Sequence, residues 1–232
     1  MEKKFTFISD THMKHRHLSL EGGFCLVFSG DCMTHGYDVT ELEDFLKWFS
    51  EQNYTYKVFV AGNHDRAIEA YPEEQARDVV EKYYDKGVRY LYNNMIEIEE
   101  YKIFGTPHQP IFGGWAFNTP SDELVDVYSM IPEGLDLLVT HCPPKDILDK
   151  SHMKTYRNPT GEEPLGSEEL QERLKEMTNP PHYHVFGHIH GDGGKVFKDE
   201  KTTYINASVC DEGYRPTNEV ISLLIKPKLN VF

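Results

Sequence analysis

The sequence has no long apolar run, no closely spaced cysteine pair and no excess of basic residues. A membrane-spanning helix needs about 20 mainly apolar residues, and no stretch approaches that length. The apolar part of the opening MEKKFTFISD is too short for a signal peptide. We therefore expect a cytoplasmic protein without membrane contact.

The cysteines are few and far apart. Cys25, Cys32, Cys142 and Cys210 form no CxxC pair, which argues against a zinc knuckle and favours reduced thiols. Basic residues are outnumbered, with 24 Lys and Arg against 38 Asp and Glu and a formal net charge of −14. Long nucleic acids bind through many Lys and Arg contacts to phosphate, so we do not expect one as a partner. A small anionic substrate is still compatible with this negative net charge, because bound divalent cations reverse the charge locally.

The composition is that of a folded protein. The chain has 232 residues, 39% hydrophobic and 27% charged, which is the ordinary globular range. This length can bury a substantial core, and the sequence has no internal repeat and no linker-like segment. We expect residues 1–232 to form a single domain.

Apolar runs rich in β-prone residues alternate with helical patterns in the first part of the chain. A strand-rich remainder follows, so we expect an α/β fold, mixed α+β, with a mixed sheet or two stacked sheets. Five buried strands are expected at 4–8, 24–28, 57–61, 135–139 and 183–186, and shorter ones at 95–99, 101–105, 202–206 and 219–225. Helices are expected over 42–49 and 76–83 and from residue 167, and long surface loops over 105–120 and 157–166.

Capping residues support these helices. Thr40 and Glu43 form a capping box before the first helix. Pro72 suits the first turn of the second helix and Gly87 its end. Ser167 is the expected N-cap of the third.

Each of the five buried strands is followed directly by residues able to bind a metal. The segments are SDTH, SGD, GNHD, THCPP and GHIH. In open α/β sheets, ligand sites form just beyond the carboxyl ends of strands, so we expect these side chains to converge. The candidates are Asp10, His12, Asp31, Asn63, His64, His141, His188 and His190.

Carboxylate and imidazole ligands together suit Mn, Fe, Zn, Ni or Co rather than calcium, and the lack of thiolates argues against structural zinc. The set exceeds the needs of one ion, whereas two divalent ions about 3.5–4 Å apart and bridged by a shared carboxylate would use all of it. Such a pair lowers the pKa of a bridging water and so supplies a hydroxide nucleophile at neutral pH.

Each motif alone has an ordinary structural interpretation. Asp-x-His, Gly-Asp and Gly-Asn-His-Asp are common in turns and helix caps. His141 can be a hydrogen-bonded core residue, and GHIH can be an edge strand with both histidines on one face. The recurrence of compatible ligands after all five strands favours the metal site.

In order, the motifs D-x-H, GD, GNHD, TH and GHxH, from Asp10 to His190, resemble those of the calcineurin-like metallophosphoesterase superfamily. The segments GTPHQPIFGGWAFN, IPEGLDLLVTHCPP and TTYINAS resemble the branch of brain-type metallophosphoesterase-domain-containing proteins and their bacterial relatives. The resemblance implies a two-sheet β-sandwich flanked by helices and a phosphoesterase with a binuclear metal centre.

By this resemblance, Asp31 bridges the two metals and His64 lies beside the substrate phosphate, where it stabilises an oxygen or protonates the departing alkoxide. Asp65 is the expected residue to orient His64. One metal would be held by Asp10, His12, Asp31 and His190, and the other by Asp31, Asn63, His141 and His188.

Two thiols depart from the usual pattern. Cys142 stands where the branch often has glycine, and Cys32 directly follows Asp31. We interpret both as buried packing residues, with an oxidation-sensitive site as the alternative.

A phosphodiester is the expected substrate, a cyclic nucleotide being one candidate. A phosphomonoesterase, or a nucleotide-binding regulatory protein with weak hydrolysis, is the alternative. Besides Asn63 and His64, the segment at 105–118 offers Phe112, Trp115 and Phe117 as stacking faces and His108, Gln109 and Asn118 as polar contacts for a base, unless it packs on its own aromatics. The basic cluster at 14–17 either meets a second phosphate or is solvated, and we favour the solvated state.

Overall fold

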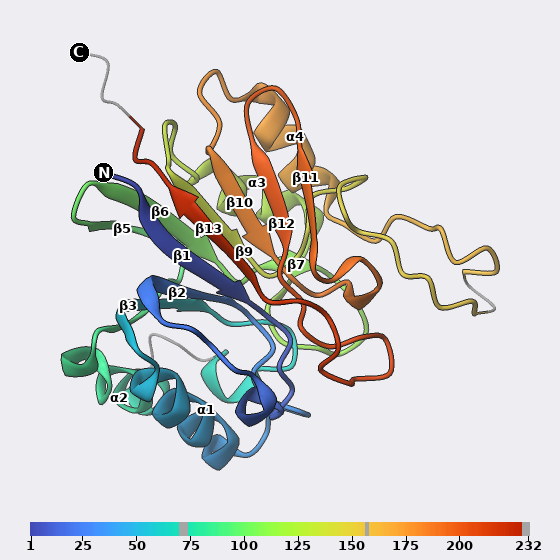
Figure 1. The fold of residues 1–232 in the computed structure, drawn as a ribbon. Coiled ribbons are helices and arrows are strands. Elements are labelled where there is room, and N and C mark those ends of the chain that lie inside the picture. Colours follow the sequence, from blue (N-terminus) through green and yellow to red (C-terminus); the bar gives the residue numbers. More distant parts are fainter. Residues whose placement is uncertain (70–73, 156–157, 229–232) are drawn as a thin grey trace.

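Two β-sheets packed face to face form the centre of the computed structural model, which describes residues 1–69, 74–155 and 158–228. In the first sheet the strand order is β13-β1-β2-β3-β4, and all strands are parallel except β13 (Figure 1). These strands are β1 (Lys3–Ile8), β2 (Gly23–Ser29), β3 (Tyr54–Val60), β4 (Val88–Tyr90) and β13 (Ile221–Ile225).

The second sheet has the order β11-β12-β10-β9-β6-β5, with four parallel strands between two antiparallel edges. A short parallel pair, β7 and β8, lies apart from both sheets. The strands are β5 (Asn94–Ile98), β6 (Tyr101–Thr106), β7 (Gln109–Pro110), β8 (Asn118–Thr119), β9 (Leu137–Thr140), β10 (Tyr183–Phe186), β11 (Lys195–Lys198) and β12 (Thr203–Asn206).

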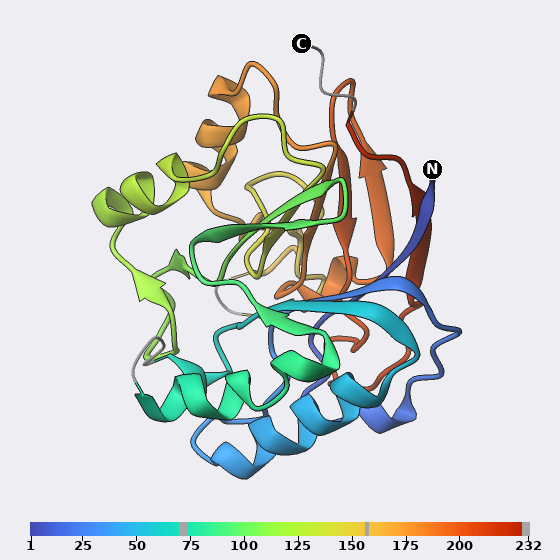
Figure 2. The same ribbon diagram turned by 90° about the vertical axis from the view of Figure 1, so that its left-hand side faces the viewer.

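Helices cover the outer face of each sheet. Figure 2 shows α1 and α2 (blue and teal) on one side of the molecule and α3 and α4 (yellow-green and orange) on the other. No helix in the described ranges is long and apolar enough to cross a membrane. The helices are α1 (Val39–Glu51), α2 (Glu74–Glu81), α3 (Ser121–Ser129) and α4 (Glu168–Glu176).

Alternation along the strands builds the layers, because successive side chains point to opposite faces. On β2, Leu26 and Phe28 pack with the residues of α1, whereas Val27 belongs to the core between the sheets. On β9, Val139 faces the same inter-sheet core and Leu138 packs with α3 and α4. The predicted fold, a two-sheet α/β sandwich flanked by helices, is confirmed.

The helix ends agree with the sequence in part. Ser167 caps α4 by accepting from Leu170 N at 3.2 Å, as predicted. The predicted capping box at Thr40 is wrong, because Thr40 lies inside α1. The N-cap is Asp38, whose carboxylate accepts from both the backbone N–H and the hydroxyl of Thr40. Gly87, with φ +80°, ends a short 3-10 turn (Tyr84–Lys86) rather than α2, and Pro72 lies outside the described residues.

Sequence reasoning missed α3, although Asp122 and Glu123 stand in its first turn and Leu124 and Tyr128 face the core four residues apart. The predicted loop at 105–120 contains the β7–β8 pair. The other predicted loop, at 157–166, has no helix or strand in its described part, residues 158–166.

Candidate metal centre

The ends of five parallel strands meet at one edge of the two sheets. Backbone hydrogen bonds link these ends within each sheet: Asp10 N donates to Gly30 O at 2.8 Å, and Gly187 N donates to His141 O at 3.0 Å. Each strand positions one or two of the predicted residues. Asp10 and His12 follow β1, Asp31 follows β2, Asn63 and His64 follow β3, His141 follows β9, and His188 and His190 follow β10.

The chain turns sharply as it leaves these strands. Asp10, His12, Asp31 and His188 all have positive φ angles, between 40° and 67°. Non-glycine residues rarely adopt this left-handed conformation, and strained backbones concentrate at functional sites. Here the turns direct side chains from separate strands toward a common centre.

Asp10, His12 and His190 form the first cluster. His190 Nε2 lies 3.3 Å from Asp10 Oδ1 and 3.3 Å from His12 Nε2. Both carboxylate oxygens of Asp10 also contact the backbone N–H of His188, at 3.1 and 3.0 Å, and Oδ2 accepts from the hydroxyl of Ser208 at 2.6 Å. Sequence reasoning missed Ser208, whose only signal was its place in the segment TTYINAS.

Asp31, His141 and His188 form the second cluster, with Asn63 among them. Asn63 Oδ1 lies 3.0 Å from His141 Nε2 and 2.8 Å from His188 Nδ1. Asp31 Oδ2 lies 3.4 Å from His141 Nε2 and 3.9 Å from His12 Nε2 of the first cluster. One carboxylate oxygen therefore faces both clusters.

Backbone carbonyls orient three of the histidines. The Nδ1 atoms of His12, His141 and His190 lie 3.1, 2.8 and 3.0 Å from the carbonyl oxygens of Met33, Ser29 and Asp211 respectively. A carbonyl only accepts, so Nδ1 carries a proton and Nε2 is the atom that can present a lone pair to a bound cation. This arrangement is typical of metal-binding histidines.

The donor spacing fits bound cations. Two donors about 2.1 Å from one ion and at right angles are about 3.0 Å apart. The pairs within the clusters are 2.8 to 3.4 Å apart. The facing Nε2 atoms of His12 and His190 need a proton or a cation between them, because two facing lone pairs repel each other. The clusters can therefore hold divalent metals.

The electrostatics of the centre also favour cations. Burial raises the pKa values of Asp10 and Asp31, but neighbouring histidines outweigh burial and hold both below their ordinary range. Burial lowers the pKa of His12 to about 4 and that of His188 to about 3, so both imidazoles are neutral near pH 7 and able to coordinate. Burial opposes the charged forms of His141 and His190 as well, but Asp31 raises the pKa of His141 to about 9 and Asp10 raises that of His190. A metal bound by either imidazole would therefore displace a proton.

Asp65 does not contact the imidazole that it was expected to orient. Its carboxylate accepts from the backbone N–H groups of Asp31, Gly62 and Met33, at 2.8, 2.8 and 3.0 Å. His64 Nδ1 instead contacts the carbonyl oxygen of Thr34. Asp65 thus joins the loops after β2 and β3, and burial together with Asp31 raises its pKa to about 6.

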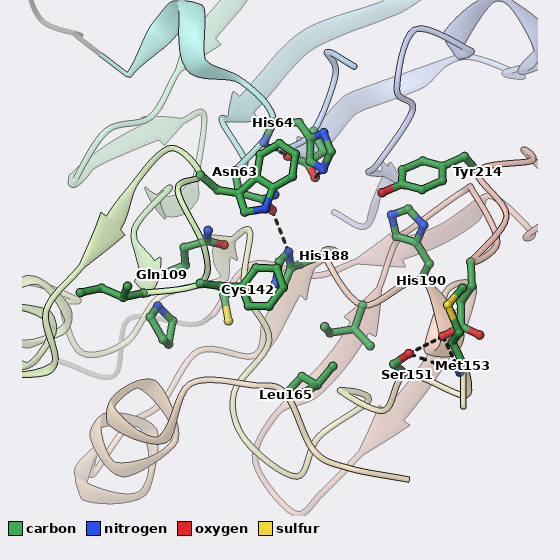
Figure 3. A pocket seen from close by; sticks show the side chains of 17 residues that line it. Asn63, His64, Gln109, Cys142, Ser151, Met153, Leu165, His188, His190 and Tyr214 are labelled. Carbon is green, nitrogen blue, oxygen red and sulfur yellow. Dashed lines mark hydrogen bonds and ion pairs between the residues drawn. The ribbon is translucent and has the colours of Figure 1, made fainter. Parts of the chain in front are cut away.

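A cavity of about 530 Å³ opens beside the two clusters, which is within the usual range for small-molecule sites. Figure 3 shows Asn63 and His64 on one side of it and Leu165 on the other. Trp115 lines this cavity and stacks on His64 with the ring centroids 4.2 Å apart. Tyr214, which was not predicted from the sequence, has its ring centroid 4.8 Å from that of His12 and 5.2 Å from that of His190.

Two predicted substrate contacts face elsewhere. The ring nitrogens of His108 are bonded to Asn93 and Thr119, at 3.1 and 2.8 Å. The side chain of Asn118 bonds the backbone of its own loop, at Phe112 and Gly113. Neither residue lines the cavity.

Other candidates from the sequence have structural partners. In the basic cluster at 14–17, Arg16 pairs with Asp44, and His15 is buried against aromatic rings beside the same carboxylate. No residue of this cluster lines the cavity. Cys32 and Cys142 are both buried, and burial raises the pKa of the Cys32 thiol well above its usual value and that of Cys142 to about 12. Both are therefore thiols rather than reactive thiolates.

The fold and the paired Asp/His clusters together define a protein of the metallophosphoesterase class. A sequence model of the calcineurin-like phosphoesterases matches residues 3–192, and the chain belongs to this family. It is 33% identical to human metallophosphoesterase domain-containing protein 1, with 94% of this chain and 69% of the human protein covered, and equally to the mouse protein. The predicted resemblance is confirmed.

Solved structures show the same fold at low sequence identity. The phosphopantetheinyl hydrolase PptH from Mycobacterium tuberculosis superimposes with a TM-score of 0.59 at 14% identity, over 97% of this chain and 96% of that one. TT1561 of Thermus thermophilus gives 0.55 at 11% identity, over 97% and 100% of the two chains. At these identities the likeness concerns the fold alone.

Proposed function

We propose that this chain hydrolyses phosphodiester bonds with two divalent metal ions, and that residues 1–232 act as one metallophosphoesterase domain. The observation that carries the proposal is the position of Asp31 Oδ2, 3.9 Å from His12 Nε2 and 3.4 Å from His141 Nε2. A carboxylate oxygen that faces two separate ligand groups is suited to bridge two ions.

In this proposal the ligands divide along the two clusters. When bound, the ions supply Lewis acidity toward phosphoryl oxygens and a water nucleophile at neutral pH. One ion would be held by Asp10, His12, Asp31 and His190, and the other by Asp31, Asn63, His141 and His188.

His64 is the proposed catalytic residue that is not a ligand. With His12 and Asp31 it forms a third group of possible metal ligands, and its Nε2 lies 4.0 Å from Asp31 Oδ2. We assign it to the substrate rather than to a metal because its ring is fixed between the Thr34 carbonyl and Trp115, which lines the cavity. From this position it can stabilise an oxygen of a bound phosphate or protonate the departing alkoxide.

The charge of the cavity supports a diester over a monoester. Among the described residues that line it there is no lysine or arginine. A diester carries one negative charge near pH 7, whereas a monoester carries nearly two and gains more from cationic side chains. A cyclic nucleotide, with one charge and an aromatic base for Trp115, is one candidate.

Metal-stripped protein reconstituted with Mn, Fe, Ni, Zn or Mg tests the proposal, with bis-p-nitrophenyl phosphate and p-nitrophenyl phosphate as substrates. We expect activity that depends on added metal and a kcat/KM at least roughly 10-fold higher for the diester. Undiminished hydrolysis by stripped protein would refute the metal dependence, and faster monoester cleavage would refute the diester preference.

A further inference from the structure

Exposed apolar side chains gather around the mouth of the cavity. Ile111 and Phe112 are 63% and 59% exposed, and Met153, Leu165 and Tyr214 are also well exposed. All five line the cavity, although they come from three segments far apart in the sequence. Isolated exposed apolar residues are ordinary, but a cluster around a concave site marks a binding surface.

This apolar surface is continuous with the candidate metal centre. Trp115 stacks on His64, and Tyr214 contacts the rings of His12 and His190. Figure 3 shows Met153 and Leu165 across the cavity from Asn63 and His64. A substituent of a phosphate held at the clusters would therefore be within reach of these side chains.

The charges around the cavity are unfavourable to a second anion. Beyond the metal-cluster side chains, His64 and the neutral thiol of Cys142, the ionisable groups among its described lining residues are those of Glu212 and Tyr214. Glu212 Oε1 accepts from Ser151 Oγ at 2.6 Å and from Met153 N at 3.0 Å, so its carboxylate is fixed at the wall.

Arg66, a cation on the Trp115 side of the cavity, already has partners. Arg66 lies over the ring of Trp115, with Cζ 5.2 Å from the centroid, and its guanidinium donates to Gly114 O. It does not line the cavity.

We propose that the cavity binds an uncharged aryl or other apolar substituent of the phosphate held at the metal centre, and discriminates against a substituent with its own negative charge. This inference rests on the proposed phosphoesterase function and names the class of substrate: esters with a single phosphate and an apolar group, in preference to di- and triphosphates.

Phosphonates test the inference, because they are not hydrolysed and present one substituent each. The dissociation constants of methylphosphonate, phenylphosphonate and 4-carboxyphenylphosphonate are measured by calorimetry on metal-loaded protein. We expect phenylphosphonate to bind at least roughly 10-fold more tightly than methylphosphonate, which corresponds to ~1.4 kcal/mol. The carboxylate should remove most of this gain.

Substitutions test which side chains bind the phenyl group. The double variant Phe112→Ala, Leu165→Ala should bring the phenyl-to-methyl affinity ratio close to one while leaving methylphosphonate affinity unchanged. The control is Phe197→Ala on β11, since Phe197 is 46% exposed but outside the cavity. It should change neither affinity.

Methylphosphonate distinguishes failure of the apolar cavity assignment from failure of the phosphoesterase proposal. If it binds and phenylphosphonate has no advantage, or if the carboxylate strengthens binding, the apolar cavity assignment is overturned while the phosphoesterase proposal stands. If no phosphonate binds the metal-loaded protein, the cavity assignment fails, whereas the phosphoesterase proposal is decided separately by metal-dependent hydrolysis of bis-p-nitrophenyl phosphate.

Discussion

Replacing Ser208 with alanine should weaken one metal site and leave the other intact. Ser208 is fully buried, and its hydroxyl donates to Asp10 Oδ2 at 2.6 Å. Alanine leaves the backbone and most of the packing in place but removes this donor. Ser29→Ala is the matched control, because Ser29 is equally buried beside the same centre and its hydroxyl has no hydrogen-bond partner.

The size of the effect follows from the charge of the acceptor. A hydrogen bond to a charged group contributes about 1.5–3 kcal/mol. Removing a residue that orients a metal ligand typically costs about 10–100-fold in metal affinity. Asp10 keeps its contact with the backbone N–H of His188, so we expect partial loss at the Asp10, His12 and His190 cluster rather than abolition.

Calorimetric titration of Mn²⁺ into metal-stripped protein measures both sites, and urea unfolding of the stripped protein measures stability. Ser208→Ala should raise one dissociation constant by about 10–100-fold and lower the free energy of unfolding by about 1.5–3 kcal/mol. Ser29→Ala should change neither quantity appreciably. Equal effects of the two substitutions, or two unchanged sites in Ser208→Ala, would refute this reasoning.

Three further substitutions test other parts of the structure. Asp65→Ala should lower the stability of stripped protein by roughly 2–4 kcal/mol in urea unfolding, because three backbone N–H groups lose their acceptor. Removing the buried charge of Asp65 offsets only part of this cost. Lost turnover with unchanged stability would instead favour the predicted role of Asp65 in orienting His64. Trp115→Ala should lower kcat by freeing His64 while metal content stays the same; a parallel loss of metal would count against this. Phe45→Ala should cost about 3–5 kcal/mol of stability, since Phe45 is fully buried in the core under α1, and a loss below about 1 kcal/mol would contradict the assigned packing.

The sequence predicted the elements that bring the candidate site together. Buried strands are recognised by short apolar runs, and the residue after such a run lies at the edge of the sheet whatever the rest of the fold. Asp10, Asp31 and His141 follow three such strands, and the structure brings all three together.

The sequence predicted the walls of the cavity less well. Tyr214 belongs to no strand or helix, and its position depends on a loop held by hydrogen bonds from Asn218 to the carbonyl oxygens of Ser208 and Cys210. No local pattern reveals such long-range contacts.

The fold also decides the partners of two residues predicted to contact the substrate. His108 and Asn118 are polar residues in an aromatic loop, which made them candidates for base recognition. In the structure, their side chains bond Thr119 and the backbone of Phe112 within the same loop. Residue type indicates what a side chain can bind, but only the fold decides which partner is within reach.

Metal titration of two variants beside the wild type tests the central claim most directly. The wild-type chain should bind two Mn²⁺ ions per molecule and hydrolyse bis-p-nitrophenyl phosphate. His64→Ala should keep both ions and lose about 10²–10⁴-fold in turnover, whereas Asp31→Ala should lose metal and activity together. An Asp31→Ala protein with two bound ions and wild-type rates would contradict a two-metal centre bridged by Asp31.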